Sequence, residues 1–337
     1  MNQLMNHRIV IPRRGGPEVL QLIEEDAPHP GADQIRVKML ASGVSGHDTM
    51  LRRAWFPGFP SVPFTPGVDI VGVVDELGRE AIGFEPGEVV AALLPAEGGY
   101  SELVCVPASQ AVSVPPGVDP AEAVCVVANY LTAYTMLHRA AEVESGERAL
   151  IHGAAGGVGS ALLELGLLAG LEVYGTASLR NHDLLKTRGI TPIDYRKADF
   201  VVQIRELTGD GVDVVFDPIG GARQLWRSYR ALRPRGRLVW FGVAATSRAG
   251  MGVIPASLIT RLFLSLIPDG KKAPMPPDVS KPNGWYRDTL VLLLDYLATG
   301  KINPLVAERI PLNQAERAHE LLDRGGCAGK VVLVSTD

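Results

Sequence analysis

The chain has 337 residues, about twice the ~150 residues at which a second domain is expected, so we predict two domains, each with its own hydrophobic core. Hydrophobic residues make up 46% of the sequence and charged residues 21%, which is typical of a globular protein and excludes a disordered chain, a collagen or a coiled coil. With 33 Lys and Arg against 37 Asp and Glu, the net charge of -4 excludes the global positive field of a nucleic-acid-binding protein.

The cysteines and the apolar stretches indicate the compartment. Cys105, Cys125 and Cys327 are too scattered for a disulfide framework, and no two have the spacing of a zinc clip. Residues 1–14 are polar and basic and lack the apolar core of a secretory signal. The apolar stretches fall short of the ~20 residues that cross a bilayer. We therefore expect a cytoplasmic protein, with neither membrane nor nucleic acid as a partner.

The first third of the chain has the texture of a β-rich domain. Between residues 8 and 122, short apolar runs with β-branched residues are separated by Gly and Pro. This pattern predicts a β-rich, partly barrel-like unit. The runs that we expect to form strands are 35–40, 68–74, 88–94, 100–106 and 111–114.

After Pro120 the texture changes. The Ala-rich stretch 121–142 predicts a helix, and from Arg148 onward apolar strand-like runs alternate with helical segments. That alternation predicts βαβ units around a parallel sheet. We expect strands at 149–152, 172–176, 192–194, 212–217 and 237–242, and helices at 158–169, 181–188, 199–208 and 221–232.

The C-terminal part is too short for a third domain and is expected to return to the first. Residues 267–285 are Pro-rich and predict a loop, followed by helices at 286–300 and 315–324 and a last strand at 330–334. The predicted domains are residues 1–123 (N-terminal part of a β-rich domain), 124–266 (the inserted parallel-sheet domain) and 267–337 (the C-terminal return).

A glycine-rich turn lies between the strand at 149–152 and the helix that follows it. Residues 152–159 read His-Gly-Ala-Ala-Gly-Gly-Val-Gly, the context in which backbone N–H groups meet a pyrophosphate at a helix N-terminus. Gly156 allows close approach of the phosphate and Gly159 lets the helix pack on the sheet, while Ala154 replaces the first Gly of G-x-G-x-x-G. The alternative is a purely structural turn. The βαβ context favours a dinucleotide held by Ala155, Gly156, Gly157 and Val158.

The end of the second parallel strand predicts which dinucleotide binds. An NAD site would carry Asp or Glu here to bond the ribose hydroxyls, but the sequence continues Ala177-Ser178-Leu179-Arg180. Ser178 can donate a hydrogen bond to a 2′-phosphate and Arg180 can pair with its charge, which favours NADP(H). Alternatively, Arg180 is a solvated surface residue.

Together these segments resemble the medium-chain dehydrogenase/reductase superfamily, specifically its zinc-free quinone oxidoreductase (zeta-crystallin-like) branch. The resemblance extends over nearly the whole chain and implies an α/β protein: a GroES-like β-rich catalytic domain, an inserted Rossmann domain with a doubly wound parallel sheet, and a cleft between them. The segments that carry it are 16–20, 66–74, 98–102, 131–134, 152–159, 193–196, 212–217 and 329–333.

The residues at the metal positions of the alcohol dehydrogenase relatives argue against zinc. Where those relatives have a Cys and a His-Glu pair, this sequence has Ser45, Val68 and Asp69, and the four closely spaced cysteines of the structural zinc are missing. We expect no metal, with His47 as the remaining alternative ligand.

The resemblance also implies the coenzyme contacts one by one. Ser45 falls where quinone reductases usually have Asn near the nicotinamide, and Thr132 falls where the family bonds the nicotinamide end, although a helix-interior Thr bonding its own backbone is the alternative. Tyr195 resembles the tyrosine that flanks the 2′-phosphate. The nicotinamide half would be lined by Gly220, Phe241, Gly242 and Val243.

The hypothesis that follows is hydride transfer from NADPH to a quinone or an α,β-unsaturated carbonyl. Without zinc, negative charge on the substrate oxygen needs hydrogen-bond donors. The candidates are Ser45, His47 and Tyr130, and Tyr130 is alternatively an apolar wall residue. The alternatives are an enoyl-thioester reductase of the same superfamily and a non-catalytic NADP(H)-binding sensor or structural protein. The resemblance further implies a homodimer.

Overall fold

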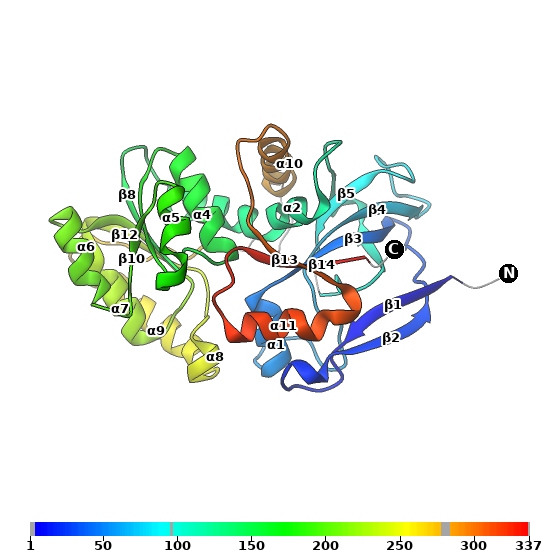
Figure 1. Cartoon of the computed structure of the whole chain (residues 1–337), viewed down its shortest axis with the longest axis horizontal. Helices are drawn as coiled ribbons and strands as arrows, with labels where there is room; N and C mark the ends of the chain where they lie inside the picture. Colours follow the sequence, from blue (N-terminus) through cyan, green and yellow to red (C-terminus); the bar gives the residue numbers. More distant parts are fainter. Residues whose placement is uncertain (1–3, 95–96, 278–283, 336–337) are drawn as a thin grey trace. The chain divides into compact units, whose positions relative to one another are not determined.

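The computed structural model describes residues 4–94, 97–277 and 284–335 (Figure 1). Contacts divide the chain into two compact units: unit 1 is Met1–Leu131 with Val279–Asp337, and unit 2 is Thr132–Asp278. The C-terminal segment thus groups with the N-terminal one. The domain boundaries given by the sequence stay a prediction, and part of the predicted loop at 267–285 lies outside the described residues.

Unit 1 is built on a seven-stranded sheet with the order β13-β14-β3-β4-β5-β7, to which β6 adds by pairing with β3. Its neighbours are antiparallel except β13 and β14. A separate antiparallel hairpin joins β1 and β2. The strands are β1 (Met5–Val10), β2 (Gln21–Asp26), β3 (Gln34–Val44), β4 (Asp69–Leu77), β5 (Val89–Leu93), β6 (Leu103–Pro107), β7 (Ala111–Ser113), β13 (Val306–Pro311) and β14 (Lys330–Val334).

Helices complete unit 1, and strand β3 contributes to two of the apolar clusters formed by its described residues. Ile35 and Val37 belong to one cluster and Met39 and Val44 to the other, all of them buried. The helical elements are η1 (Pro17–Val19), α1 (Gly46–Arg53), η2 (Ala108–Gln110), α2 (Pro120–Cys125), the π-helix η3 (Val126–Tyr130), α10 (Gly284–Ala298), η6 (Leu312–Gln314) and α11 (Ala315–Arg324).

The predicted helix at 121–142 is present, but it is not a regular α-helix. After α2 and η3 it continues as α3 (Leu131–Thr135) and a second π-helix, η4 (Met136–Ala141). Wider π turns are rare and occur often at functional sites. A π turn of this length cannot be recognised from the apolar periodicity of a sequence, so the sequence predicted only a helix.

Unit 2 is a parallel five-stranded sheet with the order β10-β9-β8-β11-β12. The chain runs outward from β8 through β9 to β10, then returns to the other side of β8, so the strand order reverses between β8 and β11, where ligands bind in sheets of this kind. The α/β class, with a β-rich unit and a doubly wound unit, is confirmed. The strands are β8 (Arg148–His152), β9 (Glu172–Thr176), β10 (Thr191–Ile193), β11 (Val212–Asp217) and β12 (Leu232–Trp240).

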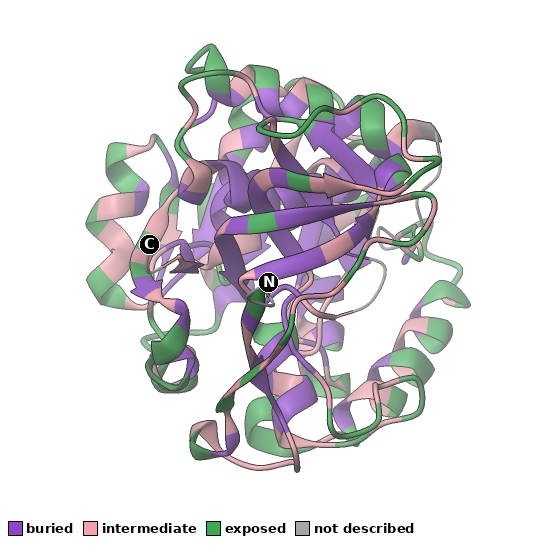
Figure 2. Cartoon of the chain, turned by 90° about the vertical axis from the view of Figure 1, so that its right-hand side faces the viewer, coloured by how far each residue is buried: buried purple, intermediate pink, exposed green. Residues whose placement is uncertain are grey.

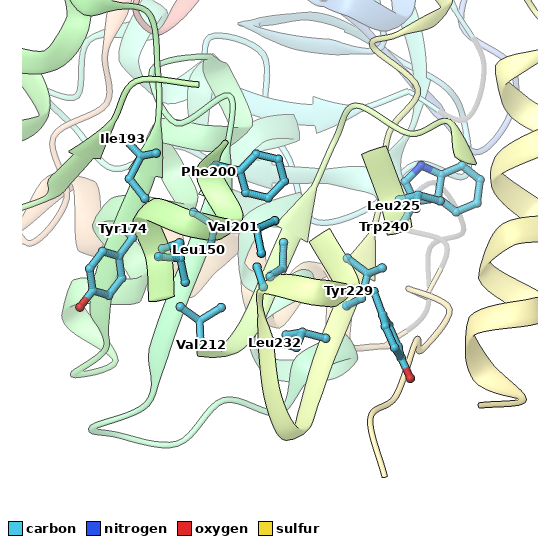
Figure 3. Packing of buried hydrophobic residues seen from close by; sticks show 14 of the residues in the cluster. Leu150, Tyr174, Ile193, Phe200, Val201, Val212, Leu225, Tyr229, Leu232 and Trp240 are labelled. Atoms are coloured by element: carbon cyan, nitrogen blue, oxygen red, sulfur yellow. The ribbon is translucent and has the colours of Figure 1, made fainter. Parts of the chain in front are cut away.

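The strands of unit 2 are covered by helices. All residues of β11 are buried, Asp213 and Asp217 included, as expected for a strand of a parallel sheet with both faces covered. Figure 2 shows the general contrast: strands are coloured mainly as buried, whereas much of the helices and loops is intermediate or exposed. Leu150 and Val212 from the strands and Phe200 and Leu225 from the helices belong to one buried apolar cluster (Figure 3). The helices are α4 (Gly157–Leu168), η5 (Leu179–Asn181), α5 (His182–Thr187), α6 (Phe200–Thr208), α7 (Ala222–Ala231), α8 (Thr246–Ala249) and α9 (Val253–Ser265).

Some elements of unit 2 differ from the expectation. Strand β12 spans Leu232–Trp240 instead of the predicted 237–242, and helices α8 and α9 were not predicted. Among the described residues, no helix has both the length and the apolar character needed to cross a membrane.

Candidate active site

The glycine-rich turn follows β8 and leads into α4. Within it, Gly156 N–H donates to Gly153 O (2.9 Å) and Ala154 N–H donates to Thr176 O (3.0 Å), which ties the turn to the end of β9. A Cβ atom at Gly159 would lie 2.2 Å from Gly153 O, so only glycine lets the helix start this close to the turn. No side chain of the described residues caps α4 at Gly156, which leaves the first amides of the helix to bind an anion.

A second turn at the same edge of the sheet follows β11 and meets the segment after β12. Asp217 Oδ1 accepts the N–H groups of Ile219 (2.7 Å) and Gly220 (3.1 Å). Gly220 has a φ of +73°, and Phe241 N–H donates to Asp217 O (3.0 Å). A Cβ atom at Gly242 would lie 2.7 Å from Pro218 O. The structure thus brings the predicted residues Gly220, Phe241 and Gly242 together, with Val243 next along the chain.

The residues predicted for a 2′-phosphate follow two adjacent strands. Ile193 pairs with Thr176 between β10 and β9, and Ala177 N–H donates to Ile193 O (3.2 Å). Ser178 and Arg180 therefore leave the sheet beside Tyr195, with Arg180 and Tyr195 exposed. The Arg196 guanidinium lies over the Tyr195 ring at 5.6 Å. Arg196 is a cation of this edge to which the sequence analysis gave no role, although it stands in the segment that carried the resemblance.

In unit 1, Ser45 and Asp48 form a capping box at the start of α1. Ser45 Oγ donates to Asp48 Oδ2 (2.6 Å), and the same carboxylate oxygen accepts Ser45 N–H (2.8 Å). Asp48 Oδ1 accepts Gly67 N–H (3.0 Å). Asp48 thus caps the helix and fixes the 67–68 loop, and the hydroxyl proton of Ser45 points at a buried carboxylate.

His47, next to this capping box, has a partly exposed side chain close to two carboxylates. Its side chain is 46% exposed and its Nε2 lies 3.7 Å from Glu97 Oε1. Partial removal from water lowers the pKa of His47, but the hydrogen bond to Glu97 and the charges of Asp48 and Glu97 outweigh this and raise it above its ordinary value. The same pairing with His47 lowers the pKa of Glu97. The carboxylates of Asp48 and Glu97 therefore stabilise the protonated form of His47 relative to a free imidazole.

Tyr130 and Thr132 lie on the irregular helix. Tyr130 is buried at the end of η3 and belongs to unit 1, whereas Thr132 is half-buried on α3 and begins unit 2. The bulk of Tyr130 therefore contributes to packing, in line with the alternative that it is an apolar wall residue.

The three residues at the zinc positions do not fit a zinc site. Val68 has no ligand atom, and the Asp69 carboxylate lies 2.6 Å from Lys330 Nζ with both side chains buried. Lys330 Nζ also lies 3.5 Å from Asn129 Oδ1. Burial raises the pKa of Asp69 and the Lys330 ammonium opposes that shift. Over residues 4–94, 97–277 and 284–335, no group of three or more His, Cys, Asp and Glu side chains is placed to hold a metal ion.

Comparison with known proteins identifies matching domain families and similar proteins. Residues 31–116 match the alcohol dehydrogenase GroES-like domain, and residues 190–333 match the family described as zinc-binding dehydrogenase. The chain is 35% identical over 240 residues to the synaptic vesicle membrane protein VAT-1 homolog of Rattus norvegicus, which covers 70% of this chain and 59% of that protein. The chain thus spans about three fifths of the length of the first such relatives. It is 27% identical over 325 residues to the Homo sapiens quinone oxidoreductase, which covers 95% of both.

The solved structures agree with this fold. The crystal structure of Escherichia coli quinone oxidoreductase complexed with NADPH matches with a TM-score of 0.86 and 29% identity, covering 97% of this chain and 99% of that one. The GroES-like match lies in unit 1, and the zinc-binding dehydrogenase match begins in unit 2 and ends in unit 1. These relatives support the predicted membership of the medium-chain dehydrogenase/reductase superfamily, in its quinone oxidoreductase branch.

Proposed function

We propose that this protein is an NADPH-dependent reductase that transfers hydride, without zinc, to a quinone or an α,β-unsaturated carbonyl. The observation that carries the proposal is the convergence of three features on one edge of the unit 2 sheet. These are the uncapped start of α4, the turn at Gly220 and the cationic edge at Arg180 and Tyr195. The NADPH held by the related Escherichia coli structure supports the same coenzyme.

In this proposal each feature holds one part of the coenzyme. The amides of residues 155–158 receive the pyrophosphate, because a helix N-terminus favours negative charge. Ser178, Arg180 and Tyr195 receive the 2′-phosphate, and the segments at 220 and 241–243 leave room for the nicotinamide half, with Ser45 and Thr132 as contacts at its end. The bound coenzyme supplies the hydride.

The substrate oxygen then needs a proton, and we assign its donation to His47. The Ser45 hydroxyl already donates to Asp48, and Tyr130 is buried. His47 has an exposed side chain and a raised pKa, and its Nε2–H faces Glu97, whose charge holds the imidazolium. We further propose that the protein acts in the cytoplasm as a homodimer.

A coenzyme titration followed by turnover tests the function. Fluorescence titration with NADPH and with NADH is expected to show preference for NADPH. Both coenzymes are then assayed with a small quinone, an enone and an enoyl thioester. Oxidation of NADPH by the quinone or enone supports the proposal, and turnover of the thioester alone would make the protein an enoyl-thioester reductase. NADPH binding without turnover on any of them would replace the enzyme with a coenzyme-binding protein.

The assignment of His47 has its own test. We expect His47→Gln to lower kcat for enone reduction about 100-fold or more, because a positioned acid contributes about 10²- to 10⁴-fold to the rate. Activity of the wild type should fall as the pH rises through the raised pKa of His47, and the variant should lose that alkaline limb. His29→Gln is the control, since His29 is another exposed histidine with its Nδ1 3.8 Å from Glu76. Unchanged pH profiles in the His47 variant would remove this role.

A further inference from the structure

A buried polar chain crosses the carboxyl-terminal edge of the unit 2 sheet beneath the two turns. His152, the last residue of β8, has Nδ1 3.1 Å from Thr176 Oγ1 and Nε2 3.1 Å from Ser228 Oγ. Thr176 Oγ1 accepts Gly153 N–H (3.3 Å), and Ser228 Oγ donates to Asp217 Oδ2 (2.7 Å). All four side chains are at most 3% exposed. The proposed hydride transfer gives none of them a task.

The direction of every hydrogen bond in this buried series follows from the Asp217 carboxylate. Asp217 only accepts, so the single hydroxyl proton of Ser228 points at it, and Ser228 Oγ must then accept His152 Nε2–H. Burial lowers the pKa of His152, against the opposing charge of Asp217, so the ring is neutral and its Nδ1 accepts from the Thr176 hydroxyl. Thr176 Oγ1 therefore accepts from Gly153 N–H.

The two ends of this hydrogen-bond chain lie in the two turns where the strand order reverses. One end is the amide of Gly153 in the glycine-rich turn. The other is Asp217, whose second oxygen receives the amides of Ile219 and Gly220. Gln224 Nε2 adds a further hydrogen bond to Asp217 Oδ2 (3.2 Å). The hydrogen bonds from the Gly153 amide to Asp217 Oδ2 all point toward the carboxylate and polarise one another. The amides of the second turn donate to the same carboxylate, which therefore couples the two turns.

We infer that His152 is a positioning residue: with Thr176, Ser228 and Asp217 it fixes the glycine-rich turn and the 217–220 turn in the mutual arrangement that receives the coenzyme. This inference rests on the proposed binding of NADP(H). The imidazole is suited to the task because it is rigid and presents an acceptor and a donor on opposite sides. Its ring is also held by an edge-on contact with Phe200, with centroids 4.6 Å apart.

Thr176→Val tests the inference because it keeps the shape of the side chain and removes the hydroxyl. We expect the Kd for NADPH to rise roughly five- to tenfold, the equivalent of one lost hydrogen bond, with kcat at saturating NADPH within about twofold of the wild type. Thr176→Ser keeps the hydroxyl and should restore the wild-type Kd. Thr208→Val is the matched control, because the Thr208 hydroxyl also accepts a glycine N–H, that of Gly211 (3.0 Å), and donates to a backbone oxygen, that of Ile204 (2.7 Å).

A spectroscopic measurement on the wild type is independent of turnover and of any variant. The 15N shifts of labelled histidine should show His152 at pH 7 as a neutral ring protonated at Nε2. A ring protonated at Nδ1, or a cation, would overturn the inference. So would a Thr176→Val protein that binds NADPH as tightly as the Thr208→Val control. A wild type that binds no NADPH would overturn the proposed function itself, and this inference with it.

Discussion

Coenzyme choice is set at the scale of single residues. The edge after β9 and β10 has cations and a hydroxyl where an NAD site needs a carboxylate. We expect Arg180→Ala to raise the Kd for NADPH about tenfold or more and to leave the Kd for NADH nearly unchanged, because only NADPH has the 2′-phosphate that the guanidinium pairs with. Parallel fluorescence titrations measure the ratio, with Arg205→Ala on α6 as the control. An equal loss for both coenzymes would place Arg180 outside the phosphate site.

A second single-residue effect concerns stability in unit 1. His319 is fully buried, with Nε2 3.2 Å from Tyr100 Oη, and burial lowers its pKa to about 4. The unfolded chain takes up this proton near pH 6.5, but the folded chain does not until about pH 4. The folded state therefore loses stability as the pH falls between these values, by about 3 kcal/mol at most from this group.

We expect His319→Gln to be less stable than the wild type at pH 7.5 and to lose less stability on acidification. Urea unfolding at pH 7.5, 5.5 and 4.5 gives the free energy of unfolding of both proteins, and the difference between them should shrink toward the lowest pH. A difference that stays constant across the three pH values would contradict the assignment of this proton to His319.

The sequence could predict those site residues whose partners lie only a few positions away along the chain. The Ser45 and Asp48 pair has the three-residue spacing of a capping box, and the glycine turn is contiguous, so both could be recognised from the sequence. The ion pair of Asp69 and Lys330 joins β4 to β14, near opposite ends of the chain. The hydrogen-bond chain through His152 likewise gathers side chains from three strands and one helix, a proximity that only the folded sheet creates.

At the scale of elements, the packing of α4 depends on one glycine. A Cβ atom at Gly159 would lie 2.2 Å from Gly153 O, so Gly159→Ala must displace the turn or the helix. We expect a loss of about 1–3 kcal/mol in the free energy of unfolding and a weaker affinity for NADPH.

Gly166→Ala on the same helix is the control for this prediction. Its added Cβ would meet Leu171 Cδ1 at 3.4 Å, an ordinary contact, and alanine favours a helix by up to about 1 kcal/mol over glycine. Chemical unfolding and coenzyme titration of both variants measure the contrast. Equal effects at the two positions would show that the turn tolerates the extra atom.

The elements that the sequence predicted well are those with an uninterrupted pattern. The strands 172–176 and 212–217 and the helix 315–324 agree residue by residue with β9, β11 and α11. The two strands are rich in β-branched and aromatic residues, and α11 has apolar residues on one face. The first half of β12 contains Pro234 and Gly236 with Arg235 at a φ of +66°, which resembles a turn. Helix α9 has Pro255 near its start and apolar residues on its exposed side, so it lacks the usual amphipathic pattern.

The exposed apolar side of α9 bears on the assembly of the whole molecule. Its exposed side chains Leu258, Ile259, Leu262 and Phe263 are spaced to lie on one face of α9, and Leu266 continues it. Arg261, the charged residue of this helix, is held by a hydrogen bond to Ala273 O (2.9 Å). An exposed apolar face of this kind is typical of an interface. Because the face is uncharged, it suits a copy of itself, as the two-fold contact of a homodimer requires.

We therefore expect the homodimer to depend on this face. Ile259→Glu, at a side chain that is 69% exposed, places a charge in the proposed interface, where its burial would cost several kcal/mol. Light scattering coupled to gel filtration should then give the mass of a monomer where the wild type gives that of a dimer. Leu207→Glu on α6 is the matched control, since Leu207 is an apolar side chain 53% exposed in the same unit, and its mass should stay that of the wild type. A monomeric wild type would reject the homodimer, and a dimer that survives Ile259→Glu would place its interface away from α9.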